Sequence, residues 1–224
     1  MRRALLAEGV GTALLLATVV GSGVMGESLA GGNVALALLA NAAATAGALY
    51  VLITVLGPVS GAHFNPVVTL VMRLRGDIGT RTALAYVAVQ CVAAVAGVLL
   101  AHAMFDLAWI QPGVRARAGG AQWLSEGVAT FGLLLTILLG ARHHARALPA
   151  LVAAWIFAAY WFTASTAFAN PAVTLSRALT RTFSGIRPDN VPAFVLAQLG
   201  GALLALAVVR GIAPATASSP HEVP

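Results

Sequence analysis

Two short stretches decide the fold: residues 60–69 read SGAHFNPVVT, and residues 169–175 read ANPAVTL. In both, an Asn precedes a Pro, and an apolar run of about two helical turns follows. Asn is a favoured N-cap residue and Pro is favoured at the first helical position, so each Asn-Pro pair predicts the start of a helix. A helix needs about 20 apolar residues to cross a bilayer. We therefore expect two half-helices, starting at Pro66 and Pro171, that are too short to span a membrane.

The composition indicates that these half-helices belong to a membrane protein. Of the 224 residues, 59% are hydrophobic and only 9% are charged, whereas roughly a quarter of the residues in a soluble domain carry charge. All thirteen basic residues are Arg, and they stand singly or in pairs between apolar runs. Nucleic-acid binding needs a basic stripe on a polar surface, so we expect no nucleic-acid partner. The single cysteine, Cys91, excludes an internal disulfide and a multi-cysteine metal site, and we expect neither metal nor cofactor.

Hydropathy divides the chain into six segments long enough to cross a bilayer. The predicted spans cover roughly 4–25, 33–56, 82–104, 123–141, 148–168 and 191–209. We expect one channel-like domain over residues 1–212, with a first repeat at about 4–105 and a second at about 122–210, followed by a disordered tail over 213–224. With the N-terminus inside, the cytoplasmic loops carry eight Arg and the outer loops carry five. The positive-inside rule therefore favours a cell (inner) membrane protein with both termini in the cytoplasm.

The second half of the chain repeats the first. Three motif pairs occur in the same order, at offsets of 118, 105 and 108 residues: EGVGT 8–12 with EGVAT 126–130, FNPVVTL 64–70 with ANPAVTL 169–175, and AYVAVQ 85–90 with AFVLAQ 193–198. Each half holds three spans, and an odd number makes the second half enter the membrane from the opposite side. The sequence therefore predicts an all-α membrane protein in which six spans and two re-entrant half-helices form an inverted repeat.

The meeting point of the half-helices is the predicted pore. Non-helical backbone is tolerated at membrane depth only against protein or a water-filled cavity, which is how we interpret residues 57–63 and 164–169. Each helix N-terminus carries about half a positive elementary charge, and the amides of Asn65 and Asn170 add N–H donors. Such a centre orients a neutral hydrogen-bonding molecule and repels cations and protons. One Asn-Pro pair is usually only a capped helix, but two at equivalent places of an inverted repeat favour a pore.

Three further polar residues fall within the predicted membrane region. Glu8 and Glu126 are intramembrane carboxylates, which are expensive and normally functional. They serve either as a proton relay or as hydrogen-bond acceptors that support the re-entrant loop of their own half, and their symmetry favours the second role. His63 lies beside the first motif at the inner vestibule, where a pH gate and simple hydrogen bonding are both open.

These motifs resemble the aquaporin, or major intrinsic protein, family over nearly all of residues 4–210. The resemblance rests on the 60–69 stretch, on Asn170-Pro171-Ala172 with the Val-Thr that follows, and on Glu8 and Glu126 at their repeat positions. It implies an aquaporin-like fold, a homotetramer in the lipid bilayer with one pore in each subunit, and passive passage of small neutral solutes and water. The first motif reads Asn65-Pro66-Val67 where the family usually has Asn-Pro-Ala, and the larger valine narrows or tilts that junction.

A larger departure concerns the outer constriction. Most family members have an Arg directly after the second motif, and here that position is Val173. Family spacing puts the other constriction positions at Thr45, Ala158 and Ala167. The resemblance therefore implies a wide, apolar outer mouth without its positive charge, as in bacterial aquaglyceroporin-like or metalloid-channel-like members. Arg177, one turn beyond Val173, either partly replaces that charge or lies at the outer membrane interface, and we favour the interface.

We thus expect a channel, not an enzyme, for glycerol, urea and uncharged metalloid hydroxides such as arsenite, together with water. A strictly water-selective channel is the first alternative. An ion-coupled transporter would use discontinuous helices as well, but it would need a coupling carboxylate at the midplane. An intramembrane serine protease would need a Ser–His dyad from different helices, and no His lies in the second half of the membrane region.

Overall fold

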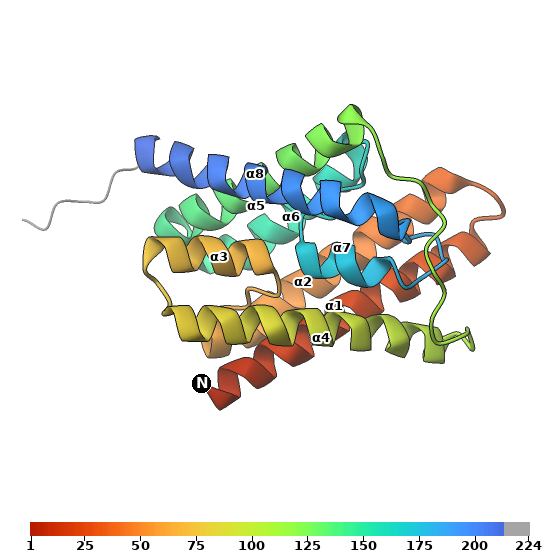
Figure 1. Ribbon diagram of the computed structural model, residues 1–224, viewed down its shortest axis with the longest axis horizontal. Helices are drawn as coiled ribbons and strands as arrows, with labels where there is room; N and C mark the ends of the chain where they lie inside the picture. Colours follow the sequence, from red (N-terminus) through yellow and green to blue (C-terminus); the bar gives the residue numbers. More distant parts are fainter. Residues whose placement is uncertain (213–224) are drawn as a thin grey trace, which may run out of the picture.

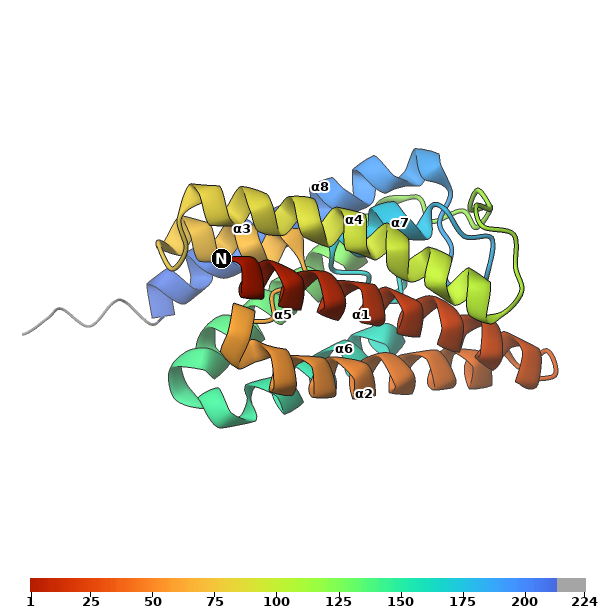
Figure 2. The ribbon, with the colours of Figure 1, turned by 90° about the horizontal axis from the view of Figure 1, so that it is seen from below.

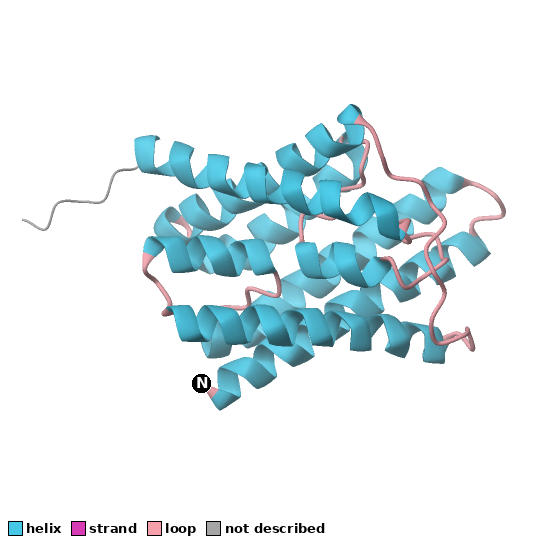
Figure 3. Ribbon diagram, viewed as in Figure 1, coloured by secondary structure: helices cyan, strands magenta, loops and turns pink. Residues whose placement is uncertain are grey.

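The computed structural model describes residues 1–212, which form helices joined by loops without any strand (Figure 3). The helices are α1 (Arg2–Leu29), α2 (Val34–Ser60), α3 (Pro66–Arg75), α4 (Thr80–Met104), α5 (Gly120–His143), α6 (Leu148–Phe162), α7 (Pro171–Arg177) and α8 (Val191–Ile212). Two short 3-10 turns, Ala145–Ala147 and Pro188–Asn190, precede α6 and α8. The tail predicted to be disordered, 213–224, lies outside the described residues.

Six of the described helices are long and apolar enough to cross a membrane. They are α1, α2, α4, α5, α8 and α6 with its preceding turn, while α3 and α7 are the two short helices. The predicted all-α class with six spans and two half-helices is therefore confirmed. One predicted boundary is wrong: the fifth span does not reach residue 168, because α6 ends at Phe162. Beyond it the amide of Ala164 donates to Ser125 Oγ at 3.1 Å, so the apolar residues that follow belong to a loop.

The two halves of the chain pack in the same way. In the first half α1 contacts α2 and α4, and in the second half α5 contacts α6 and α8, while α2 against α6 joins the halves. Glycine permits the closest crossing in each half. A Cβ at Gly97 of α4 would collide with the carbonyl of Ala13 in α1, and one at Gly201 of α8 would collide with the carbonyl of Gly127 in α5. Such small residues let membrane helices approach closely.

The half-helices α3 and α7 lie end to end in the middle of the bundle, each against both α4 and α8 (Figure 1). Seen from below, α4 passes in front of α3 and α7, and α1 runs beside α4 toward α2 (Figure 2). The N-terminus and the C-terminal end of α8 lie at the same end of the bundle (Figures 1 and 2). We call this the terminal end, and the other the opposite end.

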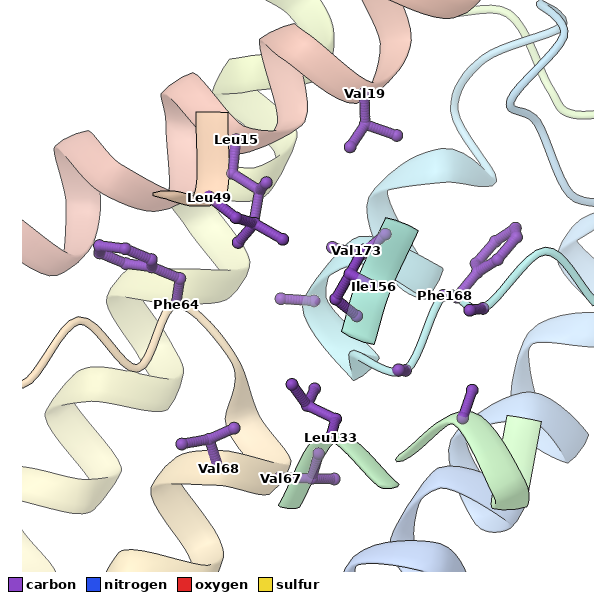
Figure 4. Packing of buried hydrophobic residues seen from close by; sticks show 14 of the residues in the cluster. Leu15, Val19, Leu49, Phe64, Val67, Val68, Leu133, Ile156, Phe168 and Val173 are labelled. Atoms are coloured by element: carbon purple, nitrogen blue, oxygen red, sulfur yellow. The ribbon is translucent and has the colours of Figure 1, made fainter. Parts of the chain in front are cut away.

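The apolar core surrounds the point where the half-helices meet. Side chains of α1, α2, α5 and α6 gather there around Val67 and Val68 of α3 and Val173 of α7 (Figure 4). The full-length helices thus form a shell, and their inner faces are available to line a passage.

Candidate functional site

The two motif asparagines cap the half-helices and also bind each other's loop. Asn65 Oδ1 accepts from the amide of Val67 at 3.0 Å, and Asn170 Oδ1 accepts from the amide of Ala172 at 2.9 Å. Their Nδ2 atoms cross over: Asn65 donates to the carbonyl of Ala169 and Asn170 to the carbonyl of Phe64, both at 2.8 Å. An amide nitrogen has two N–H donors. One donor of each asparagine therefore locks the junction, and the second is left at the cavity that both residues line.

The loops before the asparagines have an unusual backbone. Ala62 and Phe64 in the first loop, and Ala167 and Ala169 in the second, have φ between 48° and 49°. This left-handed region costs roughly 1–2 kcal/mol for each residue other than glycine. The repeated conformation holds the chain non-helical at the depth of the core, and strain of this kind persists only where the surroundings enforce it.

In the first half of the chain, Glu8 holds the strained loop in its conformation. Its carboxylate is fully buried and accepts from the amides of His63 at 2.9 Å and Phe64 at 2.8 Å, and from Gln90 Nε2 at 2.8 Å. Ser60 Oγ adds a fourth bond at 2.7 Å. The backbone donors belong to the loop itself, so the carboxylate fixes the loop against α1 and α4.

Glu126 occupies the equivalent place in the second half. It is also fully buried, and it accepts from the amides of Phe168 and Ala169, both at 2.9 Å, and from Gln198 Nε2 at 2.6 Å. The two carboxylates thus share one geometry. Neither lies among the residues that line the cavity described next, and this geometry favours loop support over a proton relay.

A cavity of about 270 Å³ follows the line of the half-helices through the bundle. Its wall includes Met72 and Leu148 near the terminal end, both motif asparagines at the centre, and Tyr160 and Arg177 toward the opposite end. The remaining wall is mostly aliphatic and comes from α1, α2, α5 and α6. Among these residues the polar groups therefore lie at the centre and toward the opposite end.

His63 lies on the terminal side of the centre and lines the cavity. Its Nδ1 lies 3.1 Å from Thr69 Oγ1, and its ring meets Tyr86 edge-on at 5.3 Å between centroids. Burial lowers the pKa of His63 below its ordinary 6.5, although the carboxylates of Glu8 and Asp77 act in the opposite direction. His63 is therefore neutral at pH 7 and hydrogen-bonded within the loop network.

The first loop also depends on Phe64, which is buried against α1. A Cβ at Gly11 would fall inside the Phe64 ring. Glycine at this position of α1 is therefore required for the ring to seat, and the ring in turn holds the residue whose carbonyl accepts from Asn170.

Three of the four predicted constriction residues line the cavity, and the fourth does not. Thr45, Ala167 and Val173 are in its wall. Ala158 is exposed on the outer side of α6 and is absent from that wall, so its assignment is wrong. Tyr160 and Ile156 face the cavity instead.

The error at Ala158 has a simple cause. A count back from Asn170 assumes a fixed loop length, whereas the seven residues 163–169 separate the end of α6 from Asn170 and the inward face of α6 follows the helical period. The spacing Val152, Ile156, Tyr160 is the i, i+4, i+8 pattern of one helix face. That pattern is visible in the sequence and would have identified the correct side. The Tyr160 hydroxyl lies 3.3 Å from Thr45 Oγ1 across the cavity wall.

The expected absence of positive charge at the outer mouth is also wrong. Arg177 is only 1% exposed and lines the cavity, and its guanidinium lies over the Phe168 ring at 3.4 Å from the centroid. Val173 and Arg177 are four residues apart in α7 and so share a face. The favoured interpretation of Arg177 as an interface residue is therefore corrected.

A second arginine, Arg117 in the loop between α4 and α5, was not predicted at all. Its Nη1 donates to the carbonyl of Ser165 at 2.9 Å and its Nε to the carbonyl of Gly185 at 3.0 Å. Burial, and then the charges of Arg177 and Arg115, lower the pKa of Arg117 to about 9. It remains protonated at pH 7 and ties the loop between α4 and α5 to the second pore loop. An Arg in a loop gives no sequence signal for contacts to backbone carbonyls of distant segments.

The chain is similar in sequence to known proteins over most of its length. The profile of the family described as "Major intrinsic protein" matches residues 1–163 and 141–223. The chain is 56% identical over 210 residues to "Aquaglyceroporin AqpS" of Rhizobium meliloti (strain 1021), covering 94% of this chain and 90% of the relative. It is 35% identical to "Aquaporin PIP2-4" of Oryza sativa subsp. japonica, covering 62% of this chain and 49% of the relative.

A solved structure has the same fold. The X-ray structure of the aquaglyceroporin from Plasmodium falciparum superposes with a TM-score of 0.76, covering 94% of this chain and 96% of that one. Sequence identity across this pair is 17%, so the likeness concerns the fold.

Proposed function

Because this chain belongs to the major intrinsic protein family, it is a multi-pass membrane channel for water and small neutral solutes and not an enzyme, and we propose that it is of the wide, glycerol-passing type. The relative of 56% identity is named an aquaglyceroporin. We extend that solute class to this chain.

The observation that carries the proposal is the cavity with two asparagine amides at its centre. Each asparagine has one N–H free after the cross-loop bond, so the centre offers two donors to a passing oxygen. The wall around them is mostly aliphatic. A polyol presents its hydroxyls to these donors and its carbon backbone to the aliphatic wall. The hydrogen bonds to the asparagines replace those that its hydroxyls lose with water, while its carbon atoms contact apolar side chains.

The proposed solutes are glycerol, urea and uncharged metalloid hydroxides. Arsenite is a neutral trihydroxide at pH 7, and it presents hydroxyls as glycerol does. The two half-helix N-termini that meet at the centre oppose cations and protons, which restricts the channel to neutral species.

A strictly water-selective channel is the second candidate. Tyr160, Thr45 and Arg177 all line the cavity, and they give its wall more bulk and polarity than a valine and two alanines would. The ratio of glycerol to water permeability separates the two candidates.

We also propose the assembly and the orientation. The chain forms a homotetramer with one pore in each subunit, lies in the cell (inner) membrane and keeps both termini in the cytoplasm. The shared position of the N-terminus and the end of α8 supports the placement of the termini (Figures 1 and 2). The outward-facing apolar side chains of α2, α4 and α8 are consistent with lipid or subunit contact.

Purified protein in liposomes tests the proposal. Stopped-flow light scattering after a glycerol or urea gradient, and arsenite uptake at pH 7, should each exceed the rates of protein-free vesicles of the same lipid. Rapid water flux with glycerol, urea and arsenite rates equal to protein-free vesicles would contradict the wide pore and favour water selectivity.

A further inference from the structure

Arg177 is a buried charge that forms no ion pair within residues 1–212. Its side chain is among the largest in the core and is 1% exposed. Within residues 1–212 the ion pairs are Arg75 with Asp77 and Arg187 with Asp189, and neither includes it. A buried charge is costly unless it is paired or hydrogen-bonded. The desolvation cost of burying Arg177 indicates that this residue has a role beyond folding.

The contacts of Arg177 hold it in place but leave its tip available. Its Nε donates to the carbonyl of Ser184, and its guanidinium plane lies against the Phe168 ring. Within the described chain its two terminal nitrogens have no hydrogen-bond partner. Since the residue lines the cavity, these N–H groups are the polar groups that the outer part of α7 offers to a solute.

Val173 and Arg177 together define the outer segment of the pore. Both line the cavity from one face of α7, and a helix rises about 1.5 Å per residue, which places the Cα of Arg177 roughly 6 Å beyond that of Val173 along α7. Val173 therefore adds an apolar side chain of α7 to the wall between Asn170 and Arg177. A solute that leaves the asparagine donors passes this valine before it reaches Arg177.

Arg117 holds the Phe168 ring against which Arg177 packs. It lies over the same Phe168 ring at 4.8 Å, and it binds the carbonyl of Ser165 in the loop that carries that ring. Burial also lowers the pKa of Arg177, to about 10, which leaves it charged at neutral pH. Arg117 is thus a positioning residue for Phe168, and through Phe168 for Arg177.

We propose that Arg177 is the specificity-determining residue of the outer mouth, donating hydrogen bonds to hydroxyl or carbonyl oxygens of the solute and excluding cations. The inference rests on the proposed channel function and assigns the selectivity of that same pore. An outer selectivity charge thereby lies one helical turn beyond Val173.

The test compares cation leak with glycerol flux in the same vesicles. Arg177→Leu and Arg177→Gln should retain glycerol flux within several-fold of wild type and raise Na⁺ or proton leak roughly tenfold or more, since a unit charge near a narrow path is a strong barrier. Arg177→Lys should keep the leak low. The matched control is Arg181→Gln, which removes an exposed arginine four residues farther on and should change neither rate.

A rescue separates selectivity from folding. Val173→Arg introduced into Arg177→Leu returns a charge to the same face one turn inward, and it should lower the leak again while reducing glycerol flux. Leak unchanged in Arg177→Leu vesicles that still pass glycerol would overturn the inference, and so would equal leak in Arg177→Lys and Arg177→Leu. Absence of glycerol flux in the wild type would instead overturn the proposed function.

Discussion

Replacing Glu126 with Gln should loosen the second pore loop and destabilise the whole protein. The carboxylate accepts three hydrogen bonds, two from loop amides at 2.9 Å and one from Gln198 at 2.6 Å. Hydrogen bonds to a charged group contribute about 1.5–3 kcal/mol each, and neutral ones about 0.5–1.5 kcal/mol. Gln keeps one acceptor oxygen and turns an NH₂ group toward a donor, which leaves one buried N–H unsatisfied at about 1–3 kcal/mol.

The sum is a loss of about 4 kcal/mol or more. It falls on a loop that already holds Ala167 and Ala169 at φ of 48°, a costly backbone conformation that the bonds to Glu126 help to maintain. The free energy of unfolding, measured by SDS titration of detergent-solubilised protein, should fall by this amount. Glu8→Gln should behave alike because its geometry is equivalent, and Glu27→Gln, which changes an exposed carboxylate in α1, should leave the curve unchanged. A Glu126→Gln curve that overlays the wild type, with altered proton flux, would refute loop support and favour a relay.

Three other experiments test separate parts of the structure. Val173→Trp should abolish glycerol flux in stopped-flow measurements, whereas Ala158→Trp on the outer side of α6 should leave the flux intact. If Ala158→Trp also blocked glycerol, Ala158 would be a constriction residue as the sequence spacing predicted. Gly11→Leu should reduce the yield of folded protein on size-exclusion chromatography, because the leucine side chain would occupy the place of the Phe64 ring. Gly47→Leu is the control: no atom lies near a Cβ added there, so the yield of folded protein should not change. The folded protein holds the pKa of His63 below 6.5, so unfolding takes up a proton and thermal stability should fall as pH drops below about 6.5. His63→Gln should flatten this pH dependence. An equal slope in the variant would show that another group causes the pH dependence.

The sequence was sufficient for the architecture because its signals are local and repeated. Each Asn-Pro pair combines a cap with a first-turn proline, and the structure has α3 and α7 starting at Pro66 and Pro171. The six apolar runs are long enough that only their ends were uncertain. The end of α6 at Phe162 was missed because the loop residues that follow it are as apolar as the helix, and only their bonds to Ser125 and Glu126 distinguish them.

The outer mouth was less predictable because it depends on contacts between distant segments. Arg177 could have been assigned from its i+4 relation to Val173, but the ring that holds it, Phe168, belongs to another loop. Arg117 comes from a third segment, and its partners are backbone carbonyls, which carry no sequence signature. Sequence patterns locate residues on an element, whereas the polarity of a pore depends on which elements meet.

The most direct test is an experimental map of the protein in its bilayer or in detergent with glycerol at high concentration. We predict a continuous passage between α3 and α7, with glycerol oxygens within hydrogen-bond distance of the free N–H groups of Asn65 and Asn170. A bundle closed at that junction, or either asparagine amide turned outward into lipid, would contradict the proposed pore.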